Sequence, residues 1–213
     1  MITLENLHRT GGIEMISIEE TVKNLKSRGF DASCFDSGKE AVDYLASQLS
    51  GETIGFGGSM TLEALGLYER LNENNKVFWH WREKSEETYK KAADAEVYIT
   101  SANAIAQTGE IINIDGSGNR VANTLYGKKK VYIIVGKNKL AEYYDTALWR
   151  ARNIASPLNA RRLNKDTPCV KGELKCYDCK SPDRICKGLV VLWNKMNGTE
   201  KAEVIIINEE LGY

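Results

Sequence analysis

The chain has few of the features that mark a membrane, nucleic-acid-binding or histidine-dependent protein. Its apolar runs, such as residues 131–135 and 204–207, are far short of the ~20 residues that cross a bilayer. The 29 basic and 29 acidic side chains cancel, which disfavours nonspecific binding of nucleic acid. His8 and His80 are the only histidines, so neither a Ser-His-Asp triad nor a paired-histidine metal site can be assembled. We expect no membrane and no nucleic-acid partner.

A secretion signal is also missing at the start of the chain. Residues 1–12 have no apolar core and no small-residue cleavage site. We therefore expect a cytoplasmic protein, in which structural disulfides are rare and clustered cysteines more often bind metal.

Cysteine is scarce except in one short segment near the C-terminus. Four thiols within eighteen residues can surround one metal centre, either zinc or an iron–sulfur cluster. Residues 150–187 hold ten Lys/Arg and four Asp/Glu, and this positive surround would balance an anionic thiolate site. Disulfides and unligated thiols are the alternatives, and the spacing matches neither a zinc ribbon nor a ferredoxin run. The predicted ligands, in a C-x6-C-x2-C-x6-C pattern inside a metal-binding excursion over residues 164–188, are Cys169, Cys176, Cys179 and Cys186.

Strands and helices alternate along the rest of the chain. Strands separated by helices of ten to fifteen residues indicate crossovers and a mostly parallel open sheet with helices on both faces. The sequence thus predicts a single α/β domain over residues 1–213, with some antiparallel pairing at residues 110–115. The helices are expected at residues 18–28, 39–49, 60–72 with a break near Gly66, 83–95, 119–126 and 140–155, where Pro157 ends the last one. The strands are expected at residues 30–35, 53–56, 76–81, 97–102, 110–115, 130–136, 188–193 and 204–208.

The first candidate ligand loop follows the strand at residues 53–56. Gly57 and Gly58 let the backbone approach a ligand closely, and the first N–H groups of the next helix favour an anion. Ser59 or Thr61 can cap that helix and also offer a hydroxyl group. The alternative is an ordinary turn between strand and helix that binds nothing.

The second candidate loop is a glycine-rich turn with polar side chains. Asp115 and Gly116 begin the turn, Gly118 extends it, and Asn119 and Arg120 sit near a helix start. A guanidinium group suits bidentate recognition of a carboxylate or phosphate. The alternative is an exposed hairpin turn with an arginine on its rim.

Two further residues are expected to be structural. Cys34 shares a strand face with Phe30 and Ala32 and is predicted to be a packed core thiol rather than a ligand. His80 alternates with two tryptophans in a predicted strand and is predicted to be structural rather than a catalytic base.

Several motifs together resemble the LUD-domain family, which is named for lactate utilization. They are GFGGSMTL at residues 55–62, TGEIINIDGSGNR at 108–120, KKVYIIVGKNKL at 129–140, the stretch from 150 to 164, the cysteine segment, and the ending EELGY. The resemblance covers residues 14–213. It implies a fold similar to the α/β domain of sugar-phosphate isomerases and CoA transferases. It also implies ligand contacts from the first loop and from Thr108, Gly109, Gly116, Gly118, Asn119 and Arg120.

The resemblance implies a component of organic-acid, lactate-type utilization that binds a small anionic metabolite. The cysteines would carry a metal centre with a redox role, with iron–sulfur favoured and an iron–sulfur protein as candidate redox partner. One alternative is a transferase or isomerase acting on a phosphate- or CoA-bearing substrate, with a structural zinc. Another is a non-catalytic binding or assembly subunit, and a homo-oligomer is left open. We expect the two loops to face each other across a cleft, with the thiols beside it.

Overall fold

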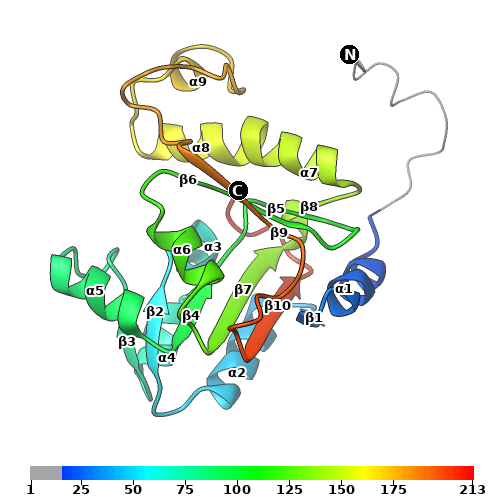
Figure 1. The fold of residues 1–213 in the computed structure, drawn as a ribbon, viewed down its shortest axis with the longest axis vertical. Helices are drawn as coiled ribbons and strands as arrows, with labels where there is room; N and C mark the ends of the chain where they lie inside the picture. The colour runs from blue at the N-terminus through cyan, green and yellow to red at the C-terminus, as the bar shows by residue number, and fades with distance from the viewer. Residues whose placement is uncertain (1–15) are drawn as a thin grey trace.

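A parallel sheet of six strands forms the centre of the structure (Figure 1). The computed structural model describes residues 16–213, so His8 and the rest of residues 1–15 lie outside the described range. Every neighbouring pair in this sheet runs parallel. From one edge to the other, the strands are β1 (Asp31–Phe35), β10 (Lys201–Ile207), β7 (Lys130–Gly136), β4 (Val97–Thr100), β2 (Thr53–Phe56) and β3 (Lys76–Phe78).

The inner strands of this sheet are mostly apolar on both faces, with Glu203 of β10 a buried exception. Residues 131–136 of β7 and 202–207 of β10 are buried without interruption. Strands with continuous apolar runs need cover on both sides, which is the arrangement of parallel sheets in α/β proteins. The predicted α/β class with a mostly parallel sheet is confirmed.

Helices cover both faces of the large sheet. On one face, Leu45 of α2 and Leu62 of α3 share a core cluster with Phe56 and Trp79. On the other face, Leu25 of α1 packs in a second cluster with residues of β7 and β10, and α5 packs against β2 and β3. The helices are α1 (Ile18–Ser27), α2 (Gly38–Gln48), α3 (Met60–Ala64), α4 (Leu67–Asn72), α5 (Glu86–Asp94), α6 (Asn119–Leu125), α7 (Tyr144–Arg150), α8 (Ser156–Arg162) and α9 (Pro168–Lys171).

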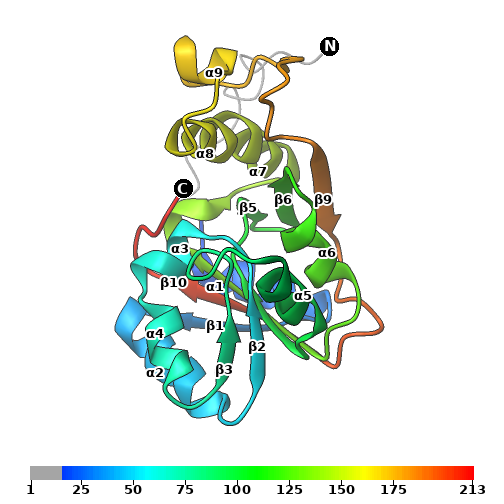
Figure 2. The same ribbon diagram turned by 90° about the vertical axis from the view of Figure 1, so that its left-hand side faces the viewer.

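A second, smaller sheet lies between the large sheet and helices α7 and α8 (Figures 1 and 2). Strand β6 runs antiparallel to both of its neighbours, which confirms the antiparallel pairing expected at residues 110–115. The two strands that follow the cysteine segment belong to different sheets, since β9 joins the small sheet and β10 joins the large one. In spatial order the strands are β8 (Leu140–Ala141), β5 (Ala104–Ala106), β6 (Ile111–Asp115) and β9 (Gly188–Leu192).

The helix predicted at residues 140–155 is wrong at both ends. Residues 140–141 form strand β8, and Pro157 does not stop the helix, which continues through α8 to Arg162. A proline inside a helix removes one backbone donor. Here the π-helical turn Ala151–Ala155 precedes it, and the Ser156 hydroxyl donates to Ala151 O at 2.8 Å. The changed hydrogen-bond register therefore accommodates the proline.

Two local predictions have opposite outcomes. The break near Gly66 is confirmed, because this residue separates α3 from α4 with a positive φ of 59° that favours glycine. The prediction that Cys34 is a core thiol is wrong, since its side chain is exposed. The reason is its position near the end of β1, the edge strand of the sheet, beyond the buried Phe30 and Ala32.

The contact between β2 and α5 leads to the first testable prediction. A Cβ atom on Gly55 would lie 2.3 Å from Ala92 O, a backbone atom that cannot move aside. We expect Gly55→Ala to lower the free energy of unfolding by about 3 kcal/mol, as measured by urea denaturation. Gly188→Ala is the matched control, because nothing lies within 4 Å of its added Cβ. Equal midpoints for the two variants would contradict this account of the packing.

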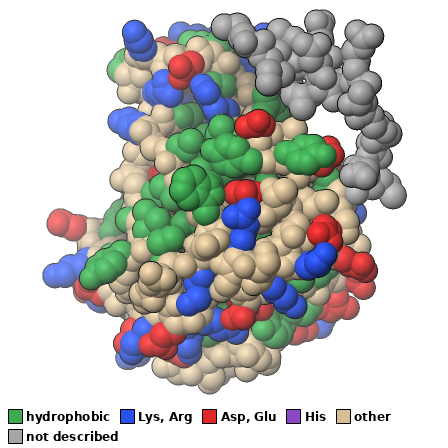
Figure 3. All heavy atoms as spheres, turned by 45° about the vertical axis from the view of Figure 1, so that its right-hand side comes forward, with side chains coloured by type: hydrophobic (Ala, Val, Ile, Leu, Met, Phe, Trp, Pro, Cys, Tyr) green, Lys and Arg blue, Asp and Glu red, His purple; other side chains and the backbone are tan. Residues whose placement is uncertain are grey.

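Among the helices of residues 16–213, none is long and apolar enough to cross a membrane. Figure 3 shows hydrophobic side chains gathered on one face, with charged groups around them. Such gatherings are typical of contacts between proteins. The homo-oligomer and the redox partner remain predictions.

Candidate functional site

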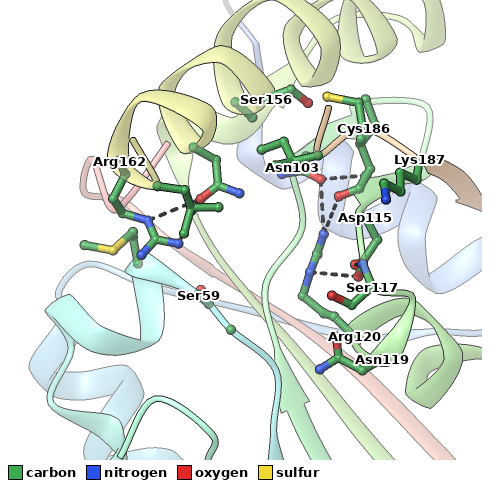
Figure 4. Close-up of a pocket in the computed structure, with 18 of the residues that line it drawn as sticks. Ser59, Asn103, Asp115, Ser117, Asn119, Arg120, Ser156, Arg162, Cys186 and Lys187 are labelled. Atoms are coloured by element: carbon green, nitrogen blue, oxygen red, sulfur yellow. Dashed lines mark hydrogen bonds and ion pairs between the residues drawn. The ribbon is translucent and has the colours of Figure 1, made fainter. Parts of the chain in front are cut away.

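One pocket of about 530 Å³ opens at the carboxyl ends of the parallel strands. The loops after β2 and β4, the turn after β6, the turn after β7 and helix α8 all contribute to its wall. Open parallel sheets bind ligands at this edge. In Figure 4, Ser59 and Arg162 lie on one side, Asp115, Ser117 and Arg120 on the other, and Cys186 above them.

The first candidate loop forms part of this wall. Gly58 and Ser59 line the pocket, and the Ser59 hydroxyl caps α3 by accepting from Leu62 N at 3.3 Å. Gly57 is buried and does not line it; a Cβ there would lie 2.9 Å from Cγ of Arg120. A glycine is thus required for the two loops to pack against each other.

The second candidate loop faces the first across the pocket. Asp115 Oδ1 accepts from the backbone N–H groups of Ser117 at 3.1 Å and Gly118 at 3.0 Å, which closes the turn. Gly118 has a φ of 84° and is the N-cap residue of α6. Asp115 Oδ2 is buried and has no hydrogen-bond partner among residues 16–213. This oxygen can accept a hydrogen bond from a ligand hydroxyl group.

Arg120 is held by protein acceptors rather than pointing freely at a ligand. Its Nη1 donates to Ser101 O at 3.2 Å and to Asn113 Oδ1, and its Nη2 donates to Ile114 O at 2.7 Å. Its Nε lies 3.6 Å from Asp115 Oδ2. Burial lowers the pKa of the guanidinium group, whereas Asp115 raises it. Arg120 therefore contributes positive charge and organises the pocket wall.

Lys139 is the most unusual group in the pocket. It follows β7 in the turn Lys137–Lys139, and its side chain is 3% exposed. Its Nζ donates to Thr61 Oγ1 at 2.8 Å and to Ser101 Oγ at 3.0 Å. Burial, together with the positive charges of Arg150 and Arg120, lowers the pKa of Lys139 to about 7. This lysine was missed in the sequence, although it lies in the motif at residues 129–140.

Positive charge dominates the pocket lining. Such an excess attracts an anion and raises its local concentration. The cationic side chains are Lys84, Arg120, Arg162, Lys165, Arg184 and Lys187, against the carboxylates of Asp115 and Asp183, and the amine of Lys139 is only partly charged near pH 7.

Aromatic rings form another part of the wall. His80 stacks on Tyr89 with ring centroids 4.8 Å apart, and Arg162 lies over the Trp81 ring at 4.7 Å. His80 is outside β3 and lines the pocket with these rings. Burial and the charge of Lys84 lower the pKa of His80. The prediction that it is structural is untested, but it sits within reach of a ligand.

Five of the predicted ligand residues do not line the pocket, namely Gly57, Thr61, Thr108, Gly109 and Gly118. Thr108 and Gly109 lie at the opposite end of β6 from Asp115 and contact Arg28, whose Nε donates to Thr108 O at 2.7 Å. The length of β6 separates these two residues from the turn at residues 115–120, so they lie apart from this pocket, and their part in ligand binding stays a prediction. Thr61 is fully buried and holds Lys139. Gly116, Asn119 and Arg120 do line the pocket.

The cysteine segment borders the same pocket. Cys186 lines it, whereas Cys176 lies in a separate surface hollow with Trp149 and Arg152. Arg184 ties the segment together, since its Nη1 donates to Cys179 O at 2.6 Å and its Nε to Cys186 O at 2.7 Å. Burial raises the pKa of the Cys186 thiol, and the neighbouring sulfurs of Cys176 and Cys169 add to the rise, whereas a hydrogen bond with Ser156 lowers it.

The four thiols suit a metal by their chemistry but are not gathered as ligands. All are free and half-buried. Over residues 16–213, no three His, Cys, Asp or Glu side chains come together in a group that could hold a metal ion. The metal centre stays a prediction, with Cys169, Cys176, Cys179 and Cys186 as the residues that would hold it.

The fold and the pocket define a class, an α/β protein with a positively charged crevice at the carboxyl ends of parallel strands. The LUD domain profile matches residues 18–207, so the chain belongs to the LUD-domain family. This membership suggests a role related to lactate utilization. The crystal structure of a DUF162 family protein from Deinococcus radiodurans is similar with a TM-score of 0.55 and 11% identity, covering 90% of this chain and 96% of that one. At this identity the likeness shows the fold alone. A comparison with curated proteins finds no match.

Proposed function

We propose that the protein binds a small organic acid of the lactate type in the pocket between residues 58–59 and 115–120. The observation that carries this proposal is the excess of cationic side chains over carboxylates in the lining. A carboxylate would lie in this positive field. The hydroxyl group of a 2-hydroxy acid would donate to Asp115 Oδ2, which forms an ion pair with Arg120 Nε at 3.6 Å but accepts no hydrogen bond among residues 16–213.

The proposal includes a metal centre at Cys169, Cys176, Cys179 and Cys186, with iron–sulfur favoured and a redox role. Its support is the set of four free thiols and the place of Cys186 in the pocket lining. A cluster held there would supply electron transfer next to the bound acid. Two arginines lie near these sulfurs. Arg152 Nη2 donates to Cys176 Sγ at 3.6 Å, and Arg184 donates to the backbone of Cys179 and Cys186. Both would offset the negative charge of the cluster.

The size of the pocket favours a second candidate function. A volume of about 530 Å³ lies in the range of pockets that hold ligands far larger than lactate. The rings of His80, Trp81 and Tyr89 add an aromatic wall. A phosphate- or CoA-bearing substrate would use this wall for its base and the positive end for its phosphates, as in a transferase or isomerase.

The test is titration calorimetry with L-lactate, pyruvate, inorganic phosphate and CoA. We expect saturable binding of a carboxylate that weakens about tenfold or more in Lys139→Met and several-fold in Lys187→Gln. Lys26→Gln is the matched control, because it removes the same charge from an exposed position on α1 outside the pocket.

The pattern of ligands decides between the two candidates. Binding of CoA or phosphate alone would favour the transferase or isomerase. Absence of saturable binding for all four ligands, or equal affinities in Lys139→Met and the wild type, would contradict an anion site in this pocket.

A further inference from the structure

The pocket contains a buried amine without an acidic partner. Lys139 Nζ is held by two hydroxyl groups, those of Thr61 and Ser101. No carboxylate forms an ion pair with it in the part of the chain that the structure describes. Buried lysines are normally paired, because an isolated buried charge is expensive. This lysine therefore has no evident structural need for its charge.

The surroundings favour the uncharged amine instead. Burial is the first cause, and two arginines, Arg150 and Arg120, repel a positive charge at this position. Arg150 donates to Asn138 O at 2.8 Å and to Asn103 O at 2.6 Å, so it is fixed beside the turn that carries Lys139. With a pKa of about 7, a large share of Lys139 is neutral near pH 7. A desolvated lysine next to other cations is the arrangement that activates an amine as a nucleophile.

We infer that Lys139 is a nucleophile that forms a Schiff base with the carbonyl group of a 2-oxo acid bound in the pocket. This inference rests on the proposed function, since the acid's carboxylate would be held by the pocket's positive charge. In a 2-oxo acid the carbonyl carbon is bonded to the carboxylate carbon. Binding of the carboxylate therefore places the carbonyl carbon near the amine. The substrate class is thereby narrowed from organic acids in general to those that carry an adjacent carbonyl.

The chemistry balances without an oxidant or a reductant. The nitrogen lone pair attacks the carbonyl carbon to form a C–N bond, and the carbonyl oxygen takes up a proton. The nitrogen loses a proton to give a neutral carbinolamine. Departure of the hydroxyl group as water, with loss of the second nitrogen proton, leaves a C=N bond. The sum is one amine and one ketone converted to one imine and one water.

The inference is tested by trapping the imine with borohydride. Wild-type protein is incubated with pyruvate and reduced, and the adduct is located by intact-mass and peptide mass spectrometry. We expect one adduct per chain, on Lys139, whose rate of formation is half-maximal near pH 7. L-Lactate, which has no carbonyl group, should yield no adduct and should compete with pyruvate. Lys139→Arg, checked by circular dichroism for a native fold, should abolish the adduct.

Three results separate this inference from the proposed function. Lactate binding without any trapped adduct would overturn the Schiff base and leave the anion site standing. Labelling spread equally over Lys84, Lys187 and Lys139 would also overturn it, because it would show ordinary surface reactivity. A single adduct on Lys139 in a protein that does not bind lactate would support the nucleophile and remove lactate from the proposed function.

Discussion

Lys139→Met should make the protein more stable at pH 7 even though it removes a pocket residue. The folded chain holds this lysine with a pKa of about 7, against about 10.5 in the unfolded chain. Methionine has a similar volume and carries no charge to bury. The two lost hydrogen bonds, to Thr61 and Ser101, offset part of the gain. We expect a net increase of about 3 kcal/mol in the free energy of unfolding, measured by urea denaturation.

The sign of the pH dependence follows from proton binding. Between pH 7 and about 10.5 the unfolded chain keeps a proton on Lys139 that the folded chain has lost. The stability of the wild type therefore gains from a rise in pH over this window. The variant lacks this contribution, so its advantage should shrink toward zero near pH 10.

Lys128→Met is the matched control for this prediction. Lys128 is also buried, but its Nζ donates to Ala92 O, Ala93 O and Ala95 O at the end of α5. Its loss leaves these carbonyl groups unpaired, so this variant should be less stable than the wild type. Equal destabilisation of both variants, or a pH-independent effect of Lys139→Met, would contradict the assignment of Lys139 as a neutral amine.

Removal of a thiol from the cysteine segment should abolish metal binding. We expect protein purified without oxygen to contain iron and inorganic sulfide, with thiolate-to-iron charge-transfer absorption. Cys179→Ser should lose nearly all of the iron, because the C-x2-C pair supplies two adjacent ligands from one turn. Metal analysis and the absorption spectrum measure both quantities.

Cys34→Ser is the control for the metal prediction. Cys34 is exposed on the edge strand β1, outside the cysteine segment, so its loss should leave the iron content unchanged. Stoichiometric zinc without iron would favour the structural-zinc alternative. Absence of both metals, or equal iron loss in the two variants, would contradict the predicted ligand set.

The cysteine segment also shows how folding and ligand binding are linked. Between α9 and β9 the segment has no helix or strand, so its conformation depends on side-chain hydrogen bonds such as those of Arg184. A metal would add ligand bonds to a segment with few backbone constraints. Metal removal should therefore loosen residues 172–187 more than the sheets, which hydrogen exchange would detect.

The local sequence pattern was sufficient to predict the central strands of the large sheet. The runs at residues 131–135 and 204–207 predicted buried parallel strands, because a strand covered on both faces must be apolar throughout. The break at Gly66 followed from the conformational freedom of one residue. In each case the determining interaction lies within a few residues of the chain.

The remaining features depended on partners distant in the sequence. Pro157 predicted a helix end, yet the π-helical turn before it and Ser156 allow the helix to continue. Cys34 shares the face of two core residues but lies at an edge that neighbouring elements do not cover. Neither outcome is encoded in periodicity, since both depend on what packs nearby.

The features of the pocket also fall into those that the sequence predicts and those that depend on the tertiary structure. The sequence alone was enough to predict an α/β chain with two glycine-rich loops and a cysteine segment, because turns and clustered residue types are local properties. Only the tertiary structure brings Thr61 and Ser101 to Lys139 and surrounds it with Arg120 and Arg150. The properties of this amine arise from burial and from charges on other elements, and both depend on distances that exist only after the strands have paired.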